Sequence, residues 1–207
     1  AASDVAALPA ELPRRAAALP GVLRVEAQRV TSLQLDPARP GVALIARTIA
    51  DPATGLPLVG ELLPVPAGET PVWVSEAMVD LYRTAPGTRF VLPLPNGARL
   101  PVVVCGVWRD YARQHGAVAI RASDYRRATG DDRSTDLALW LAPDVRSESV
   151  REPLRRLASE LGTDGALLEF AEPGAIRAIS LRIFDRSFAV TYWLQAVAIA
   201  IGLFGIA

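Results

Sequence analysis

Two short stretches of the sequence gather side chains that could do chemistry. The first is "RDYARQH", residues 109–115, which combines two arginines, an aspartate, a tyrosine and the only histidine of the chain. Histidine beside a carboxylate can transfer protons. A catalytic base also needs a group that fixes it and a nucleophile such as that of a G-x-S-x-G motif, and no such motif occurs in the sequence. We therefore interpret this stretch as a charged strand end with cross-strand ion pairs, and we predict that the chain is not an enzyme.

The second stretch is "GDDRSTD", residues 130–136, which offers three carboxylates and two hydroxyls within seven residues. These are oxygen ligands that calcium accepts, but their spacing does not match the twelve-residue calcium loop. Asp, Ser and Gly are also the usual residues of turns. We predict a polar turn before a strand, with no metal and no cofactor.

The composition excludes several classes of protein. The chain has 207 residues, and its 22 basic side chains balance its 22 acidic ones, so we expect no nucleic-acid partner. Every basic residue is an arginine, which excludes a P-loop lysine and a Schiff-base lysine. This chain therefore cannot be a P-loop ATPase by itself. The single cysteine, Cys105, lies in an apolar run and is interpreted as a small buried hydrophobe of a strand.

The pattern of apolar residues predicts an α+β fold in which strands and helices alternate. Residues 51–71 carry five prolines and three glycines, which suits a loop or a domain boundary. Asn96-Gly97 between two apolar runs predicts a hairpin with a type I′ turn, and the prolines beside it place that hairpin at a sheet edge. The other strands are expected within residues 22–36, 41–50, 73–75, 116–120, 135–141 and 166–170.

Helices are expected where apolar residues recur with a helical period. Ser75 and Ser123 are predicted N-caps of short helices, the second ending at Gly130. A longer amphipathic helix over residues 147–162 must place Pro153 in its first turn or bend there. A first helical turn or two is expected at residues 13–19.

The last 36 residues predict a helix that leads into a membrane. Residues 172–187 place their charges on one side and isoleucines on the other, as an amphipathic helix does. The twenty residues 188–207 carry no charge, and as a helix they would be about 30 Å long, the thickness of the hydrocarbon core of a bilayer. We expect the chain to be a piece of a longer protein. The residues predicted to form the membrane interface and the connecting helix are Ile179, Arg182, Asp185, Arg186, Tyr192 and Trp193.

Three stretches carry a resemblance to a known family. They are "LPGVLRVEAQRV", then "WVSEAMVDLYRTAPGTRFVLP" followed by "VCGVWRDYARQHGAVAI", and finally "SLRIFDRSFAVTYWL". In this order they resemble the FtsX/MacB-type permeases of ABC transporters, in which a large extracytoplasmic domain separates two membrane helices. The resemblance covers nearly the whole chain, although the preceding membrane helix and a first strand are absent from it.

The resemblance implies a domain organisation. It implies two α+β subdomains: a porter-like part formed by residues 1–50 and 117–171, and an inserted subdomain formed by residues 51–116. Residues 172–187 would be the connecting helix and residues 188–207 the start of a transmembrane helix.

The resemblance also implies a function and partners. The chain would be the extracytoplasmic domain of an inner-membrane permease that couples ATP hydrolysis to export or extraction of a lipid, lipoprotein, peptide or drug. Its partners would be a cytoplasmic ABC ATPase, a second permease copy or homologue, membrane lipid and further envelope proteins. The alternative is a single-pass, membrane-anchored extracytoplasmic binding module.

Overall fold

The computed structural model describes residues 7–172 and Gln195. The chain divides into two compact units, residues 1–166 and residues 167–207. The strands and the helices α1 to α5 lie in the first unit. Apart from Glu172 and Gln195, the connecting helix and the membrane segment expected at residues 172–207 lie outside the described residues.

The strands of the described residues form one mixed sheet in the order β3-β6-β4-β7-β2-β1-β8, and β5 pairs with β6 beside that path. The pairs β2/β7 and β4/β6 are parallel, and the other pairs are antiparallel. The α+β class predicted from the sequence is confirmed. The bounds are β1 (Val22–Leu33), β2 (Val42–Arg47), β3 (Leu58–Val59), β4 (Pro71–Ser75), β5 (Arg89–Pro93), β6 (Arg99–Trp108), β7 (Ala117–Arg121) and β8 (Asp136–Leu141).

Five α-helices and one 3₁₀ turn accompany this sheet within the described residues. In α5 the buried side chains are Val150, Leu154 and Ala158, spaced by four residues as an amphipathic helix requires. Pro153 lies in the interior of α5, so the predicted alternative of a first-turn proline is wrong. The bounds are α1 (Leu12–Ala17), α2 (Pro52–Gly55), α3 (Glu76–Tyr82), α4 (Ala122–Thr129), α5 (Ser147–Glu160) and η1 (Gly165–Leu167).

The central strands are apolar on both faces because two cores flank them. Val72 and Val74 of β4 belong to one core, which also contains Met78 of α3 and Tyr125 of α4. Trp73, between the two valines, belongs to a second core on the other face. A strand buried on both faces reads as a continuous hydrophobic run, which explains the sequence "PVWVS".

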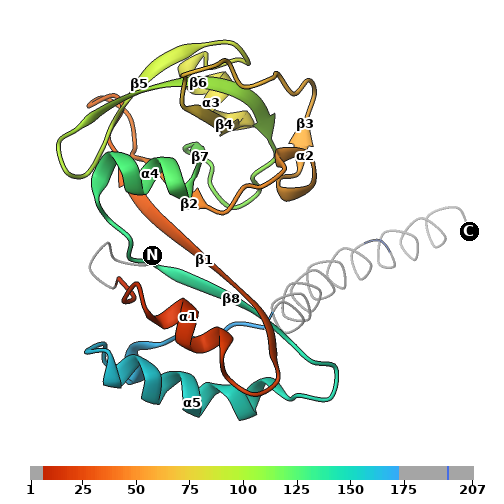
Figure 1. Cartoon of the computed structure of the whole chain (residues 1–207). Helices are drawn as coiled ribbons and strands as arrows, with labels where there is room; N and C mark the ends of the chain where they lie inside the picture. Colours follow the sequence, from red (N-terminus) through yellow and green to blue (C-terminus); the bar gives the residue numbers. More distant parts are fainter. Residues whose placement is uncertain (1–6, 173–194, 196–207) are drawn as a thin grey trace, which may run out of the picture. The chain divides into compact units, whose positions relative to one another are not determined.

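Strand β1 is shared between two groups of elements within the first unit. Its second half, from Gln28 to Leu33, pairs with β2, whereas its first half, from Val22 to Gln28, pairs with β8. We call β2 to β7 with α2 to α4 the large group, and α1, β8 and α5 the small group. Figure 1 shows β1 running from one group to the other.

The small group has buried residues of its own. Leu12 and Ala16 of α1 and Leu154 and Ala158 of α5 are all buried, and α1 packs against both α5 and β1. None of these residues belongs to either core of the large group. The fold is therefore supported by separate cores on the two sides of the point where β1 changes its partner.

The hairpin between β5 and β6 lies at a sheet edge, as predicted, but its turn differs from the prediction. A type I′ turn needs positive φ at both central residues. Here Gly97 has φ +83°, but the φ of Asn96 is not positive, since Arg83 is the only described non-glycine residue with a positive φ. The amide of Gly97 donates to the carbonyl of Leu94, and the amide of Leu94 donates to the carbonyl of Ala98. This is a three-residue loop with glycine at its last position.

One cap and one strand were also predicted wrongly, and a second cap was predicted at the right position but without its hydrogen bond. Ser123 was expected to be the N-cap of α4. The helix begins earlier, at Ala122, so Arg121 occupies the N-cap position and Ser123 lies inside the helix. Ser75 does occupy the N-cap position of α3, but its side chain makes no capping hydrogen bond. Residues 166–170, expected as a last strand, form no strand and begin within η1.

The division into a porter-like part and an inserted subdomain remains a prediction. Strand β7 pairs with β2, which was assigned to the same part, and also with β4, which was assigned to the inserted part. The hydrogen-bonded sheet is therefore continuous between the two proposed parts.

Candidate functional site

The six residues predicted at the connection to the membrane, Ile179, Arg182, Asp185, Arg186, Tyr192 and Trp193, lie outside the described residues. Their roles stay a prediction. Within the described part of the chain, none of the helices has the length and the apolar character needed to cross a bilayer.

The stretch "RDYARQH" follows the end of β6 and forms an exposed loop. Arg109 pairs with Glu76 of α3, with 3.3 Å between Nε and Oε2, and hydrogen bonds to Glu76 and Tyr111 raise the pKa of Arg109. Asp110 accepts a hydrogen bond from the backbone of Ala112 and pairs with Arg113. The charged strand end is as predicted, but the partner of Arg109 comes from a helix and not from a neighbouring strand.

This loop brings together no catalytic arrangement within the described residues. Most of its side chains are exposed, Tyr111 at 87%, but the side chain of Asp110 is only 4% exposed. The carboxylate of Asp110 is engaged by Arg113, at 3.1 Å, and not by the histidine of the stretch. The described part of the chain also contains no group of three His, Cys, Asp or Glu residues that could hold a metal ion.

The stretch "GDDRSTD" forms a polar connection from α4 to β8, as predicted, and it encloses an ion pair. Oδ2 of Asp131 accepts a hydrogen bond from Nε of Arg29 at 3.0 Å, and Oδ1 accepts one from Nε of Arg133 at 2.8 Å. The side chains of Arg29 and Asp131 are only 10% and 16% exposed. We call Arg29, Asp131, Arg133 and Thr135 the polar junction.

Thr135 joins this connection to β1 by hydrogen bonds of its amide and of its hydroxyl. Its amide donates to the carbonyl of Gln28 at 2.8 Å. Its hydroxyl accepts from the amide of Val30 at 3.0 Å, and the single hydroxyl hydrogen faces two acceptors, Oδ2 of Asp136 at 2.8 Å and the carbonyl of Gln28 at 3.3 Å. These bonds give partners to the carbonyl of Gln28 and the amide of Val30, at the place where the pairing of β1 with β8 stops.

The ionisation of the junction follows from its geometry. Burial disfavours the charged carboxylate of Asp131, but hydrogen bonds from Arg133 and Arg29 outweigh burial and lower its pKa. Burial raises the pKa of Tyr125, whose hydroxyl lies 3.5 Å from the same carboxylate, and the negative charge of Asp131 raises it further. Asp131 is therefore a stable anion at neutral pH and holds two arginines.

Sequence reasoning missed Arg29, although a signal was present. Successive side chains of a strand alternate between its faces. Arg29 therefore shares a face of β1 with Thr31 and Leu33, both of which are buried. A charged residue in this register predicts a buried partner, but nothing local in the sequence identifies Asp131, 102 positions away.

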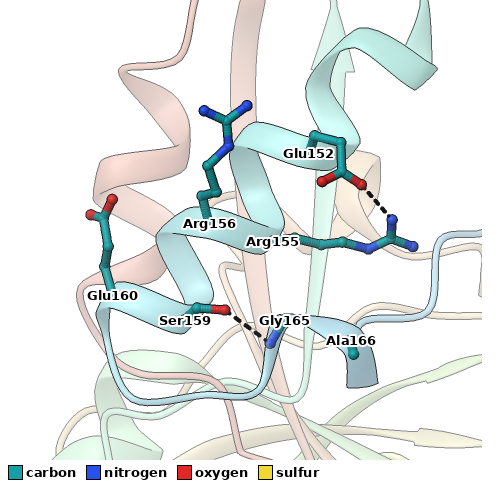
Figure 2. Close-up of a pocket in the computed structure, with 7 residues that line it drawn as sticks. All are labelled: Glu152, Arg155, Arg156, Ser159, Glu160, Gly165 and Ala166. Atoms are coloured by element: carbon teal, nitrogen blue, oxygen red, sulfur yellow. Dashed lines mark hydrogen bonds and ion pairs between the residues drawn. The ribbon is translucent and has the colours of Figure 1, made fainter.

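A surface hollow of about 580 Å³ lies on α5 beside the segment that follows it. Figure 2 shows the Glu152–Arg155 ion pair and the hydrogen bond from the amide of Gly165 to the hydroxyl of Ser159, which is 3.3 Å long. Its lining residues are Glu152, Arg155, Arg156, Ser159, Glu160, Gly165 and Ala166.

The charges of this hollow are arranged for structure and not for chemistry. Glu152 pairs with Arg155 within α5, whereas Glu160 pairs with Arg15 of α1, so the second pair ties two helices together. Gly165 is required there, because a Cβ atom at this position would lie 2.4 Å from the carbonyl oxygen of Arg155.

An aromatic side chain is exposed on the ribbon formed by β1 and β8. Trp140 of β8 is 43% exposed, and the guanidinium of Arg24 lies 4.8 Å from the centre of its ring. Leu23 is 70% exposed at a β-bulge in β1, opposite the same part of β8. This ribbon thus presents a tryptophan, a leucine and an arginine to the solvent.

Comparison with known proteins found similar chains in one class of transporter. No protein-family model matches the chain. An uncharacterized ABC transporter permease protein of Mycobacterium tuberculosis is 27% identical over 135 residues, which cover 65% of this chain. The aligned part amounts to 15% of the length of that permease.

Solved structures with the same fold come from extracytoplasmic domains of transporters. The extracellular domain of the ABC-type transporter YknZ from Gram-positive bacteria superposes with a TM-score of 0.55 at 14% identity, over 77% of this chain and 87% of that one. The periplasmic region of MacB from Actinobacillus actinomycetemcomitans superposes with a TM-score of 0.52 at 16% identity, over 76% of each chain. These similarities confirm the resemblance that the sequence motifs predicted.

Proposed function

We propose that this chain is the extracytoplasmic domain of a permease subunit of an ABC transporter of the MacB and FtsX type. The observation that carries the proposal is the shared fold with the extracellular domain of YknZ over 87% of that domain. It is supported independently by the sequence similarity to an ABC transporter permease over 135 residues. A fold alone does not fix a function, but here sequence and fold lead to the same class of protein.

The described residues favour a mechanical or binding role for this domain. The charged groups of the "RDYARQH" loop, of the polar junction and of the hollow on α5 are mostly engaged in ion pairs with one another. Such pairs hold segments in place. In the complete transporter, energy would come from a cytoplasmic ATPase; this chain itself has no lysine for a P-loop.

Within this proposal, residues 172–187 form the helix that transmits the motion of the ATPase to the domain. The transporter would then move a lipid, lipoprotein, peptide or drug out of the inner membrane or across it, with a second permease copy or homologue as its partner. The competing function is a single-pass anchored binding module, which would need neither an ATPase nor further membrane helices.

The side of the membrane can be tested with an exposed cysteine. In the complete protein, Tyr111→Cys places a thiol at a position that is 87% exposed, whereas the native Cys105 is 1% exposed. A membrane-impermeant maleimide, added to cells whose outer envelope has been made permeable, should label the variant more strongly than the unsubstituted protein. Labelling only after the cytoplasmic membrane is broken would contradict an extracytoplasmic domain.

Coupling to an ATPase needs a second experiment. Replacing Ile179 and Ser180 by Gly-Pro in the complete transporter would cost a helix about 3 kcal/mol or more at that point. Transport per ATP hydrolysed should fall, while the thermal unfolding of the domain stays unchanged. Ile179→Ala with Ser180→Ala is the matched control, because alanine preserves a helix. If the complete protein purifies from membranes without an ATPase bound to it, the anchored binding module is favoured instead.

A further inference from the structure

We propose that the polar junction is a clamp that sets the angle between the large group and the small group, and that the two groups swing about β1 when the clamp opens. This inference rests on the geometry of the described residues. It goes beyond the proposed transport function and does not depend on it.

The chain passes between the two groups at two places that lie side by side, and we call these two places the crossings. The first is Gln28, whose register partners are Arg47 of β2 on one side and Asp136 of β8 on the other. The second is the connection from Gly130 to Asp136. A two-stranded ribbon twists more readily than a strand paired on both sides. A bend in β1 next to Gln28 therefore breaks no ladder of the large group.

Each group can keep its core during such a motion. The two cores of the large group consist of residues between Leu33 and Tyr125. The buried residues of α1 and α5 belong to neither. Domains hinge where a few residues at the ends of elements absorb the change and packed cores stay intact. The two crossings meet this condition.

The clamp consists of the bonds that join the two crossings to one another. The ion pair of Arg29 with Asp131 links β1 to the start of the connection. Thr135 links the end of the connection to Gln28 and Val30. If these bonds open, the connection can separate from β1, and the two groups are then linked there only by the two segments of chain themselves.

Unpartnered buried atoms lie in the same two segments. Nη1 of Arg29, Oγ1 of Thr31 and Oγ of Ser134 are buried and have no hydrogen-bond partner among the described residues. Their residues are 9%, 5% and 4% exposed. Buried polar groups are nearly always paired in folded proteins, because an unpaired one costs free energy. In the proposed open state these atoms become accessible to water, which removes that cost and offsets part of the free energy lost with the clamp.

The test is a distance measurement between spin labels on the two groups, made on the 207-residue chain in detergent. Labels at Asp80→Cys on α3 and Arg156→Cys on α5 report the angle, because both positions are exposed. The native Cys105 is buried and takes no label. Without further change we expect one narrow distance maximum. Asp131→Asn removes the charge of the clamp and should shift part of the population to a second maximum.

The controls separate a clamp from a merely structural ion pair. Glu69→Gln breaks an ion pair within the large group, with Arg89, and should leave the distance distribution unchanged. Thr135→Val keeps the shape of the side chain and the backbone bond to Gln28 but removes the hydrogen bonds of the hydroxyl, so it should produce the same second maximum as Asp131→Asn. An unchanged distribution in a folded Asp131→Asn variant overturns the proposal. If that variant does not fold, the distribution of Thr135→Val decides in the same way.

Discussion

The hydroxyl of Ser75 accepts a hydrogen bond from the backbone amide of Ala117 at a distance of 2.9 Å. Ser75 ends β4 and occupies the N-cap position of α3, and Ala117 begins β7. Both residues are buried, at 1% and 0% exposure. A serine expected to cap a helix therefore satisfies the first amide of a neighbouring strand instead.

Ser75→Ala should destabilise the fold by about 1 to 3 kcal/mol, because the buried amide of Ala117 loses its acceptor. Urea unfolding monitored by tryptophan fluorescence measures the change. Ser149→Ala is the matched control, since the hydroxyl of Ser149 is exposed and bonds only the carbonyl of Arg146. Equal losses in the two variants would show that the bond to Ala117 has no special weight.

Gly165→Ala should destabilise the small group, because the new Cβ would lie 2.4 Å from the carbonyl oxygen of Arg155 and the segment after α5 would have to move. Overpacking of this kind costs about 1 to 3 kcal/mol. Gly55→Ala is the control, since no atom lies within 4 Å of its added Cβ. It should be neutral or slightly stabilising in a helical position. Thermal unfolding of both variants checks the difference, and a neutral Gly165→Ala would contradict the close approach.

Acidification should weaken the polar junction. The pKa of Asp131 is lowered below its ordinary value of 3.8, so its ionised form stabilises the fold fully above that value. This contribution is lost as the pH falls through the lower, folded-state pKa. When the pH is lowered from about 5 to about 2, the unsubstituted chain should therefore lose more of its free energy of unfolding than Asp131→Asn loses. Parallel pH profiles for the two proteins would rule out this role of Asp131.

A chain that ends at Glu172 should remain folded and monodisperse. The buried hydrophobic residues of the described part lie between Leu8 and Ala158, so the shortened chain keeps all of them. The 207-residue chain should need detergent or associate, because residues 188–207 are predicted from the sequence to enter a membrane. Light scattering and circular dichroism on both chains measure this. Unfolding of the shortened chain would mean that the terminal segment belongs to the core.

The sequence predicted most elements because their signals are local. The alternation within residues 22–33, the proline-rich hairpin edge and the period of α5 each depend on neighbours along the chain. The turn at Asn96-Gly97 was misread because "NG" also suits a three-residue loop that needs positive φ at the glycine alone. Local patterns thus predicted the strands and helices better than they predicted the geometry of the turn between β5 and β6.

The candidate site was harder to predict because its contacts are distant in the sequence. Arg29 finds Asp131 across 102 positions, and Ser75 finds Ala117 across 42. The residues next to Arg29 and Ser75 in the sequence would look the same if these two side chains were exposed on the surface. Only the pairing of the strands decides which groups meet, and no periodicity within a single segment contains that information.

The change of partner along β1 also sets the order in which the chain can fold. The pairing of Val22 with Leu141 and of Gln28 with Asp136 closes loops of more than a hundred residues, and contacts between distant residues form slowly. The hairpin of β5 and β6 needs only neighbouring residues. While the chain is being made, α1 and the first half of β1 remain without partners until β8 and α5 have emerged. The large group should therefore fold first, and the amino-terminal segment should stay open to chaperones and proteases until the small group closes over it.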